Sequence, residues 1–427
     1  MNVLILGGGG REHALAWKIA QSPLQNKLFV APGNAGTGEV AKNVDVDVND
    51  FQGIAHIIEE KAIDLLIVGP EAPLVGGIKD FFKRDSRFDN LSVFGPGKEG
   101  AKLEGSKDWA KTFMEKHHIP TASYKTFFKN ELNQAFDYLE HINPPYVLKA
   151  DGLAGGKGVV ICENLLKARE ELKAMLNEEK FGDASHKVVI EEFLSGIELS
   201  VFVITDGSSY KILPAAKDYK RVGEGDTGLN TGGMGSVSPV PFVDKEFMDK
   251  VENRIIKPTI DGLEHEKIDY NGFIFFGLMN VDNNPFVIEY NVRMGDPEAE
   301  SIIPRIDSDL LELIKASADK TLEEKSIEID TRYSVAVMLT SGGYPGKYEK
   351  GKVIKGIDDY EDGLVFHAGT KQKEQVITSG GRVIAVNGIG SSLEKALRIA
   401  YQGCELIDFD GKYYRKDLGQ DLKEYIK

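Results

Sequence analysis

The stretch YVLKADGLAGGKGVV, residues 146–160, begins as an apolar strand and continues as a loop with four glycines. Tyr146 to Leu148 predict a buried strand, and Lys149 ends it. Glycine is favoured where φ must be positive or where a ligand approaches the backbone. Because an unpaired charge at the end of a buried strand is costly, we expect Lys149 and Lys157 to hold an anion. A solvated surface hairpin is the alternative.

This loop lacks the spacing of a Walker P-loop. Lys157 is followed by Gly158 instead of a hydroxyl residue for Mg²⁺, and Asp151 stands where the first glycine belongs. Both lysines can nevertheless reach phosphate oxygens while the glycine backbone closes over them. We therefore expect residues 150–158 to belong to a lid that orders when a phosphate ligand binds.

The N-terminal sequence NVLILGGGGREH predicts a strand, a glycine-rich turn and a helix. The dinucleotide fingerprint G-x-G-x-x-G fails, because Glu12 or His13 occupies its third glycine position. Free N–H groups and the helix dipole still make such a turn a good anion site. We expect residues 7–10 to bind a phosphate; a tight turn without a ligand is the alternative.

The sequence PFVIEYNVRMGDPE, residues 285–298, predicts a strand with chemistry on one face. Alternation puts Glu289, Asn291 and Arg293 on one side and Ile288, Tyr290 and Val292 on the other. A carboxylate beside an amide oxygen suits Mg²⁺, and the arginine beyond them can clamp an anion. The alternative is a polar, solvated strand face.

Two further segments are candidates for ligand contact. In VVIEEFLSGIELSV, the adjacent Glu191 and Glu192 must face opposite sides of a strand, so at least one can point into a site. Solvation at a sheet edge is the alternative. Residues 223–236, GEGDTGLNTGGMGS, have no apolar periodicity; we interpret them as a loop that orders over substrate, with simple disorder as the alternative.

The order of elements predicts an α/β and α+β multidomain chain. Strand and helix signals alternate through the first hundred residues, which is typical of a parallel sheet with ligands at the carboxyl ends of its strands. A helix over 106–118, a strand–helix unit to about 192 and further strands to 292 follow, with a helix from Asp244 to about Gly262 and a turn at Asn283-Asn284. The tail from about Arg332 predicts a separate, mostly β unit.

Composition excludes several classes of protein. A chain of 427 residues is too long for one core, and a formal charge of −15 argues against sequence-independent binding of nucleic acid. We find no apolar run long enough for a membrane helix and no signal peptide at the N-terminus. Cys162 and Cys404 predict reduced core residues of a cytoplasmic protein.

Taken together, these motifs resemble the ATP-grasp superfamily and, within it, the phosphoribosylamine–glycine ligase family. The resemblance extends over essentially the whole chain through LGGGGREHALAWK, APGNAGT, VGPEAPL, LKADGLAGGKGV, IEEFLSGIELS, NTGGMGS, EYNVRMGDPE and TSGGYPG. It implies ATP-dependent ligation of glycine to 5-phosphoribosylamine, with Mg²⁺ or Mn²⁺, in a monomer or weak homo-oligomer. It also implies an N-terminal α/β domain (1–104), a two-lobed ATP-grasp domain (105–328) with a lid at about 123–192, and a C-terminal β-rich domain (329–427).

The resemblance also assigns roles to residues. The expected catalytic residues are Arg293, Lys220 and Asp218, and the expected metal ligands are Glu289 and Asn291. ATP is expected to contact Lys107, Lys149, Gly155, Gly156, Lys157, Glu191, Glu192, Leu194 and Glu198. The substrates are expected to contact Gly8, Gly9, Gly10, Glu12, Asn34, Pro70, Glu71, Gly295 and Asp296.

Two positions depart from the family pattern. Tyr219 stands where the family has histidine in Asp-His-Lys-Arg, and Ser236-Val237 replace the usual Ala-Tyr after GGMG. We therefore expect no role for these positions in the site.

Three other functions remain as alternatives. A nicotinamide-dependent oxidoreductase would need the fingerprint that fails, and a nucleotide-sensing module would not need Glu289, Asn291 and Arg293. Another ATP-grasp carboxylate–amine ligase is the nearest alternative.

Overall fold

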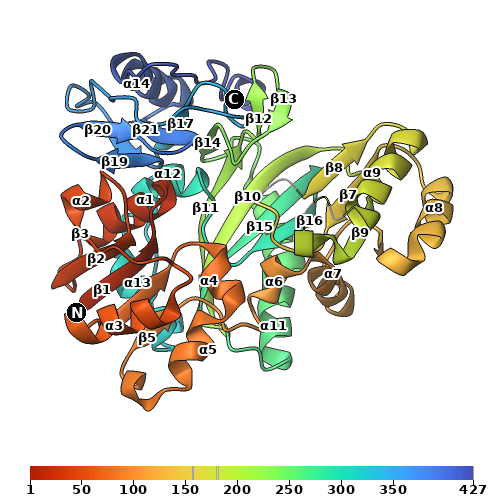
Figure 1. Ribbon diagram of the computed structural model, residues 1–427, viewed down its shortest axis with the longest axis horizontal. Helices are drawn as coiled ribbons and strands as arrows, with labels where there is room; N and C mark the ends of the chain where they lie inside the picture. The colour runs from red at the N-terminus through yellow and green to blue at the C-terminus, as the bar shows by residue number, and fades with distance from the viewer. Residues whose placement is uncertain (156–157, 179, 181, 427) are drawn as a thin grey trace.

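The computed structural model describes residues 1–155, 158–178, 180 and 182–426. Three larger sheets organise the chain (Figure 1): a parallel sheet at the left, a long central sheet, and a smaller sheet at the right. Of the residues expected at the site, Gly156 and Lys157 lie outside the described part of the chain.

The N-terminal sheet is entirely parallel, in the order β3-β2-β1-β4-β5. Short buried runs such as Leu65–Val68 form its strands because both faces are covered. The glycine turn after β1 and Pro70 after β4 therefore lie at the same carboxyl edge. Its elements are β1 (Asn2–Gly7), α1 (Gly10–Ile19), β2 (Lys27–Pro32), α2 (Thr37–Val40), β3 (Lys42–Asn43), α3 (Phe51–Lys61), β4 (Leu65–Val68), α4 (Glu71–Gly76), α5 (Ile78–Lys83) and β5 (Ser92–Phe94).

The central sheet is antiparallel and has the order β16-β15-β10-β11-β14-β17-β21-β18. It contains strands from both sides of residues 328 and 329, so the boundary expected there stays a prediction. The strands are β10 (Ile197–Thr205), β11 (Tyr210–Asp218), β14 (Gly235–Ser238), β15 (Gly272–Val281), β16 (Asn284–Asn291), β17 (Tyr333–Thr340), β18 (Leu364–His367) and β21 (Arg382–Gly390).

The third sheet, at the right of Figure 1, is the antiparallel unit β6-β9-β7-β8 with two helices packed against it. Its elements are β6 (Tyr124–Phe128), α8 (Leu132–His141), β7 (Tyr146–Ala150), β8 (Val159–Cys162), α9 (Leu165–Asn177) and β9 (Lys187–Glu192). The opening stretch of the sequence analysis thus provides β7 and β8 of this unit, with the glycine loop between them.

The remaining elements connect these sheets or cover them. The helices are α6 (Lys102–Gly105), α7 (Lys107–Lys116), α10 (Lys245–Val251), α11 (Lys257–His265), α12 (Glu298–Ile302), α13 (Leu310–Ala318) and α14 (Leu393–Leu406). The small strands are β12 (Arg221–Gly223), β13 (Thr227–Asn230), β19 (Thr370–Gln372) and β20 (Val376–Thr378). Single turns of 3₁₀ helix are η1 (Ser86–Phe88), η2 (Lys129–Glu131), η3 (Gly182–His186), η5 (Ile303–Arg305), η6 (Leu322–Glu324) and η7 (Lys423–Tyr425), and η4 (Glu252–Ile256) is a π-helical segment.

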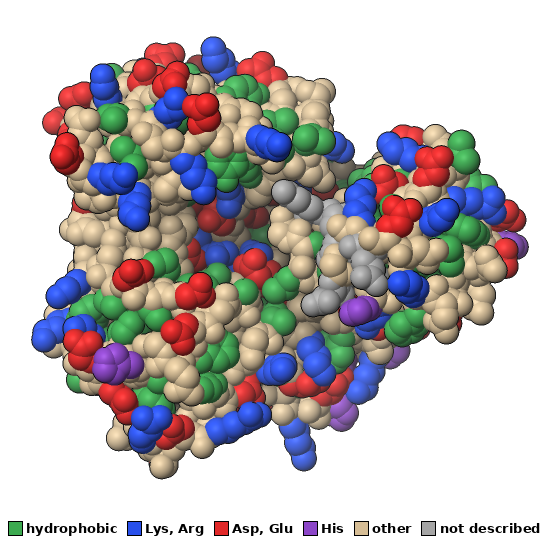
Figure 2. All heavy atoms as spheres, in the orientation of Figure 1, with side chains coloured by type: hydrophobic (Ala, Val, Ile, Leu, Met, Phe, Trp, Pro, Cys, Tyr) green, Lys and Arg blue, Asp and Glu red, His purple; other side chains and the backbone are tan. Residues whose placement is uncertain are grey.

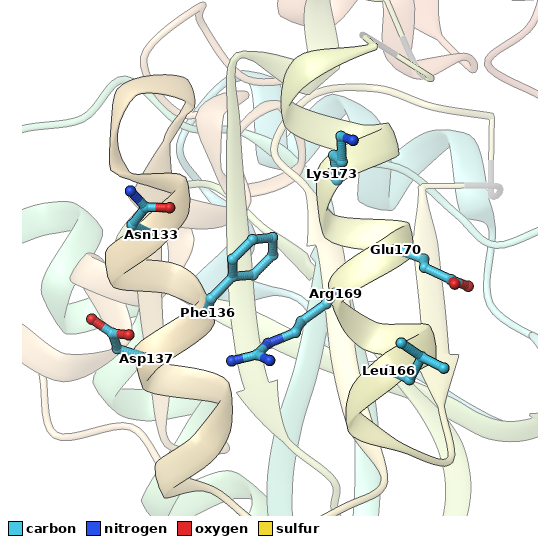
Figure 3. Close-up of a pocket in the computed structure, with 7 residues that line it drawn as sticks. All are labelled: Asn133, Phe136, Asp137, Leu166, Arg169, Glu170 and Lys173. Carbon is cyan, nitrogen blue, oxygen red and sulfur yellow. The ribbon is translucent and has the colours of Figure 1, made fainter.

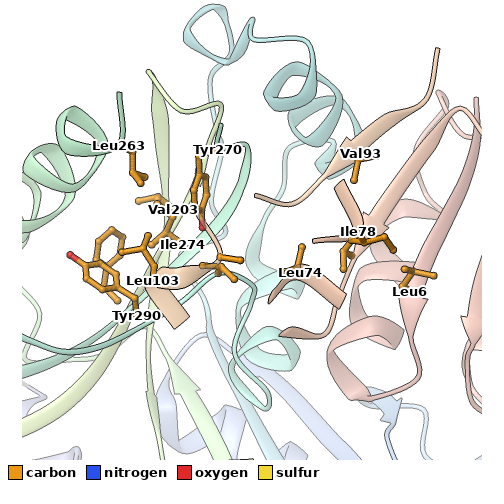
Figure 4. Close-up of a cluster of buried hydrophobic side chains, with 14 of the residues drawn as sticks. Leu6, Leu74, Ile78, Val93, Leu103, Val203, Leu263, Tyr270, Ile274 and Tyr290 are labelled. Atoms are coloured by element: carbon orange, nitrogen blue, oxygen red, sulfur yellow. The ribbon is translucent and has the colours of Figure 1, made fainter. Parts of the chain in front are cut away.

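One hydrophobic core joins the N-terminal sheet to the central sheet. Figure 4 shows Leu6 and Leu74 from the N-terminal region, together with Ile274 and Tyr290 from β15 and β16, within a single buried cluster. Burial of this apolar area is the main stabilising term, and it fixes the carboxyl edge of the first sheet beside the central one. The structure confirms the predicted α/β and α+β arrangement of a parallel α/β region, an antiparallel central region and a C-terminal region built mainly from strands.

Some local predictions are wrong. The hairpin turn expected at Asn283-Asn284 lies at Asp282 and Asn283, whose φ values of 48° and 60° suit a tight two-residue turn. The helix expected over 244–262 is present as the consecutive segments α10, η4 and α11, and only its π-helical middle was not predicted. Residues 223–236 include β13, the last residue of β12 and the first two residues of β14. The β12–β13 hairpin contacts the C-terminal region, because Gly225 N–H donates to Asp417 at 2.8 Å.

Both cysteines are buried and free, as predicted. Among the described residues, no helix combines the length and apolar character needed to cross a membrane.

Candidate active site

A hollow crosses the middle of the molecule, and several of the expected site residues are joined by contacts between its main parts. Figure 2 shows a hollow between the upper and lower left parts of this face, with acidic and basic side chains inside it. Segments from the N-terminal sheet, the central sheet and the C-terminal region contact one another, since Asp296 contacts Arg382 and Arg11 contacts Met294.

Lys149, near the end of β7, forms an ion pair and a hydrogen bond with other parts of the chain. Its Nζ lies 2.9 Å from Glu191 Oε2 and donates to Ile288 O at 2.9 Å. Lys111 pairs with the same carboxylate oxygen at 3.1 Å, and all three side chains are buried. Glu191 Oε1 has no hydrogen-bond partner in the described part of the chain, so this buried carboxylate keeps one acceptor open.

Glu191 and Glu192 face opposite sides, as predicted. Glu191 is 3% exposed, whereas Glu192 is exposed and accepts the N–H of Ser123 at 2.9 Å. Leu194 is half-buried in the segment that follows β9, and Gly155 is an exposed loop residue with φ of +56°. Their contact with ATP stays a prediction.

The N-terminus of α7 holds the start of the glycine loop. Asp151 accepts hydrogen bonds from Ser106 Oγ (3.0 Å) and from the N–H of Asp108 (2.8 Å). Lys107 Nζ donates to Gly152 O at 3.2 Å, and burial lowers the pKa of Lys107. A carboxylate and a carbonyl thus occupy the positive end of this helix.

Glu289 and Asn291 lie on the same side of β16, and the charge of Glu289 acts on both Lys107 and Lys220. Glu289 pairs in register with Gly277 of β15, and a Cβ on Gly277 would lie 2.9 Å from Glu289 Cγ. Glycine at this position therefore leaves the space through which the Glu289 side chain passes.

The predicted orientation of Ile288 is wrong. The register of β15 and β16 shifts between Glu289 and Val287, so Ile288 is the extra residue of a bulge. Val287 and Tyr290 are buried in the core, whereas Ile288 is half-buried and lies outside that cluster.

These oxygen donors fit a divalent cation. The side chain of Glu289 forms no hydrogen bond or ion pair with any described residue, so its carboxylate is available. No group of three or more His, Cys, Asp or Glu side chains in residues 1–155, 158–178, 180 and 182–426 gathers as a metal site. An ion held by Glu289 and Asn291 would complete its shell with water and phosphate oxygens, as Mg²⁺ commonly does.

A second group of charges lies at the ends of β10 and β11. Lys220 Nζ pairs with Glu198 at 2.8 Å. Burial opposes the charge on Lys220, but Glu198, Asp218 and Glu289 raise its pKa well above the ordinary value. Burial raises the pKa of Asp218, although the positive charge of Lys220 acts in the opposite direction.

Glu298 is the neighbour that the sequence analysis missed. Its carboxylate is buried, accepts Ser200 Oγ at 3.0 Å, and has its pKa raised to about 7 by burial and by Asp218. Gly295 provides the room for it, since a Cβ there would lie 2.3 Å from Glu298 Oε2.

Arg293 is held between two carboxylates. Its Nη2 donates to Glu104 at 2.7 Å, and its Nε lies 3.4 Å from Glu71. Burial raises the pKa of Glu71, but the positive charges of Arg293 and Arg11 lower it. The net effect is a pKa below the ordinary value. Arg11, missed from the sequence, is buried and donates to Met294 O at 3.1 Å, so it belongs to the same cluster.

The turn of Gly8 to Gly10 begins α1. Glu12 accepts the N–H of Gly9 at 2.7 Å, and Asn34 Nδ2 donates to Gly8 O at 3.0 Å and to His367 O at 2.6 Å. Both polar side chains are buried and fix the position of the turn through these hydrogen bonds. Their direct contact with substrate stays a prediction, as does that of Pro70, which caps α4.

Asp296 lies between the turn and the C-terminal region. A Cβ on Gly9 would be 3.2 Å from Asp296 Oδ2, and Arg382 Nη2 lies 3.0 Å from Asp296 Oδ1. Behind it, Glu300 is fully buried, and neither oxygen of its carboxylate has a hydrogen-bond partner in the described part of the chain. Burial and Asp296 raise the pKa of Glu300 well above the ordinary value.

The missed residues had different signals in the sequence. Glu298 is the last residue of the quoted GDPE motif and Glu300 lies two residues beyond it, so both could have been included. Glu104 and Arg382 are 189 and 86 residues from their partners Arg293 and Asp296, and neither lies in a distinctive pattern.

Both departures from the family pattern lie outside the cleft. Tyr219 is buried in the C-terminal core, where its hydroxyl donates to Asp421 at 2.7 Å and accepts the N–H of Gly419 at 2.9 Å. Val237 belongs to the same core, and Ser236 Oγ is buried against Pro297 O at 2.7 Å.

A separate groove lies between α8 and α9, on the third sheet's helices (Figure 3). Phe136 and Arg169 face each other across it, with the guanidinium 5.4 Å from the ring centre. None of the expected site residues lines this groove, so it is distinct from the cleft.

Comparison with known proteins agrees with this geometry. Family models of phosphoribosylglycinamide synthetase match in three parts: the N domain at residues 1–104, the ATP-grasp (A) domain at 105–299 and the C domain at 334–421.

Relatives of known name match over nearly the whole chain. Phosphoribosylamine–glycine ligases of Pseudomonas aeruginosa and Escherichia coli O6:H1 are 48% and 47% identical over 426 residues, covering 98% of this chain and 97% and 98% of theirs. The crystal structure of the Thermotoga maritima phosphoribosylamine–glycine ligase has a TM-score of 0.85 at 37% identity, covering 98% of this chain and 100% of that one.

A more distant structure shares the fold. The biotin carboxylase of Campylobacter jejuni has a TM-score of 0.72 at 15% identity, over 96% of this chain and 92% of the other. At full-length identities near 47%, with all three domain models matched in order, the chain belongs to the phosphoribosylamine–glycine ligase family.

Proposed function

We propose that the chain joins glycine to 5-phosphoribosylamine, converting ATP to ADP and phosphate and giving glycinamide ribonucleotide in de novo purine synthesis. A glycine carboxylate oxygen attacks the γ-phosphorus of ATP and releases ADP. The amine nitrogen then attacks the carbonyl carbon of the glycyl phosphate, phosphate leaves, and the nitrogen loses a proton.

The observation that supports this proposal is the presence of two groups of residues that we assign to anionic ligands. Lys149 and Lys107 form one group at the end of β7 and the start of α7, and the Gly8–Gly10 turn beside Asp296 forms the other. Transfer of a phosphoryl group depends mainly on position and charge neutralisation, and this cleft offers both without a nucleophilic side chain.

Each cation then has a distinct place. Lys149 and Lys107 would bind the ATP phosphates, Lys157 would add to them from the loop, and Lys220 and Arg293 would neutralise charge on the transferred group. Glu289 and Asn291 would hold Mg²⁺ or Mn²⁺, which supplies charge neutralisation at the β- and γ-phosphates. The glycine turn would receive the 5-phosphate through the N–H groups of Gly8 and Gly10, because Glu12 accepts the N–H of Gly9.

Release of ADP tests the proposal. With ATP and Mg²⁺ present, rapid ADP release should need glycine and freshly made phosphoribosylamine together. Equal release with another carboxylic acid in place of glycine would favour a different ATP-grasp ligase, and no release with either would contradict ligase activity. Replacing Mg²⁺ by Mn²⁺ in the same assay identifies the preferred ion.

We also propose a cytoplasmic location, because both cysteines are buried without a disulfide. A monomer or weak homo-oligomer is proposed as the working state, which sedimentation at several protein concentrations would test.

A further inference from the structure

Arg382, the first residue of β21, links two loops of the cleft. Its Nη1 donates to Gly232 O at 2.6 Å and to Asp296 O at 2.7 Å, while Nη2 lies 3.0 Å from Asp296 Oδ1. The side chain is 20% exposed and that of Asp296 is 13% exposed. One guanidinium from the C-terminal region therefore fixes both the backbone and the carboxylate of Asp296.

The same guanidinium acts on the glycine-rich segment before β14. Gly232 is held from both sides, because its N–H donates to Tyr344 Oη at 3.0 Å. The preceding residue, Thr231, donates its N–H to Lys220 O at 2.7 Å and its hydroxyl to the same oxygen at 2.8 Å. A hydrogen-bonded path thus runs from Arg382 through Gly232 to the backbone of Lys220.

Asp296, in turn, faces the turn that begins α1. The position of a Cβ on Gly9 is only 3.2 Å from Asp296 Oδ2, so little space separates the carboxylate from that turn. A shift of Asp296 would therefore change the position of the carboxylate that lies next to the Gly8–Gly10 turn. The ATP side of the cleft, at Lys149 and Lys107, has no contact with Arg382 among the described interactions.

We propose that Arg382 is a positioning residue for the phosphoribosylamine side of the site, acting through Asp296 and Gly232. The inference rests on the proposed function, since it assigns the acceptor amine to this side. Arginine suits the task because a planar fork can reach two carbonyls and a carboxylate at fixed angles, whereas a lysine ammonium is a single point donor. Charge and geometry can therefore be separated by an Arg382→Lys substitution.

A matched control exists in the same region. Arg305 is buried, whereas Arg382 is half-buried, and it also bridges two segments, through Ser238 Oγ at 2.6 Å and Asp330 O at 2.8 Å. It touches neither Asp296 nor Gly232. Tyr344→Phe is a milder second variant, because it removes only the hydroxyl that accepts the N–H of Gly232.

The test measures KM for phosphoribosylamine, KM for ATP, the Kd of Mg-ATP by calorimetry and the Kd of glycinamide ribonucleotide in the presence of ADP. Arg382→Lys should raise KM for phosphoribosylamine and the product Kd by about 10- to 100-fold, as expected for one or two charge-assisted hydrogen bonds. Tyr344→Phe should raise both by about 3- to 10-fold, as expected for one neutral hydrogen bond. ATP affinity should stay within about 3-fold in both variants, a free-energy change below that of one hydrogen bond.

Arg305→Lys should lower thermal stability without changing KM for phosphoribosylamine. An unchanged product Kd in both Arg382→Lys and Tyr344→Phe overturns the inference. So does an equal rise in Arg305→Lys, or an effect mainly on ATP. If the unsubstituted chain makes no glycinamide ribonucleotide, the proposed function fails instead.

Discussion

Replacing Lys149 by methionine should weaken ATP binding and stability together, and the structure allows the two effects to be separated. Lys149 and Lys111 share one oxygen of Glu191, and both side chains are 5% exposed or less. Removing Lys149 therefore leaves a buried Glu191–Lys111 pair and not a lone charge. Breaking a buried pair commonly costs about 3–5 kcal/mol when one charge is left unpaired.

The expected cost of Lys149→Met is accordingly smaller, about 2–3 kcal/mol, which combines part of that term with the lost donor to Ile288 O. Loss of a charge-assisted contact to a phosphate should weaken Mg-ATP binding by about 10- to 100-fold. Lys111→Met is the matched control, because Lys111 is 2% exposed and pairs with the same oxygen.

Urea unfolding and calorimetry with Mg-ATP measure both effects. Both variants should lose stability, but only Lys149→Met should lose ATP affinity by more than about 3-fold, which exceeds the loss of an ordinary weak contact. Equal Kd values for the two variants would show that Lys149 is a structural partner of Glu191 and would refute its assignment to the nucleotide.

Three further predictions concern the rest of the cleft. Gly9→Ala should raise KM for phosphoribosylamine with ATP affinity unchanged, because its Cβ meets only side-chain atoms. Gly8→Ala should mainly destabilise the fold, because its Cβ would lie 2.7 Å from the backbone oxygen of Gly33. Kinetics and thermal melts separate the two effects, and equal KM values for the two variants would count against the anion site. Gly277→Ala should displace Glu289 and raise the Mg²⁺ concentration needed for tight ATP binding in calorimetry, and an unchanged Mg²⁺ dependence would contradict the ligand assignment. Glu298 binds a proton more tightly in the folded state, so its contribution to stability is present below about pH 4.5 and is lost as pH rises towards 7. Glu298→Gln should therefore be more stable than the unsubstituted chain by about 1–3 kcal/mol at pH 8, but not at pH 4.5. A stability difference that does not depend on pH would contradict the raised pKa.

The sequence predicted the fold well where local patterns are strong. Alternating strand and helix signals correctly indicated the parallel N-terminal sheet, and the glycine loop after Lys149 correctly followed a buried strand. The predicted orientation of Ile288 failed because strict alternation assumes a regular strand, and the shift opposite Gly277 breaks it. Nothing in the local pattern of β16 indicates that shift, which depends on its partner strand.

Site residues were predictable where the residue type itself carries the chemistry. Glu289 and Asn291 stand out as oxygen ligands on one strand face, and Lys149 as a charge that ends an apolar run. Arg382 and Glu104 were missed because their importance depends on contacts with residues far away in the sequence. Such tertiary pairs have no local signature.

Glycine labelled with ¹⁸O in both carboxylate oxygens tests the central claim most directly. If the carboxylate is phosphorylated by ATP and the amine then displaces phosphate, one labelled oxygen must leave with each phosphate released. Mass spectrometry of the phosphate should therefore show one ¹⁸O per molecule in a reaction that contains ATP, Mg²⁺, labelled glycine and phosphoribosylamine. Unlabelled phosphate, formed at the same rate as glycinamide ribonucleotide, would contradict the glycyl phosphate route and with it the proposed function of this cleft.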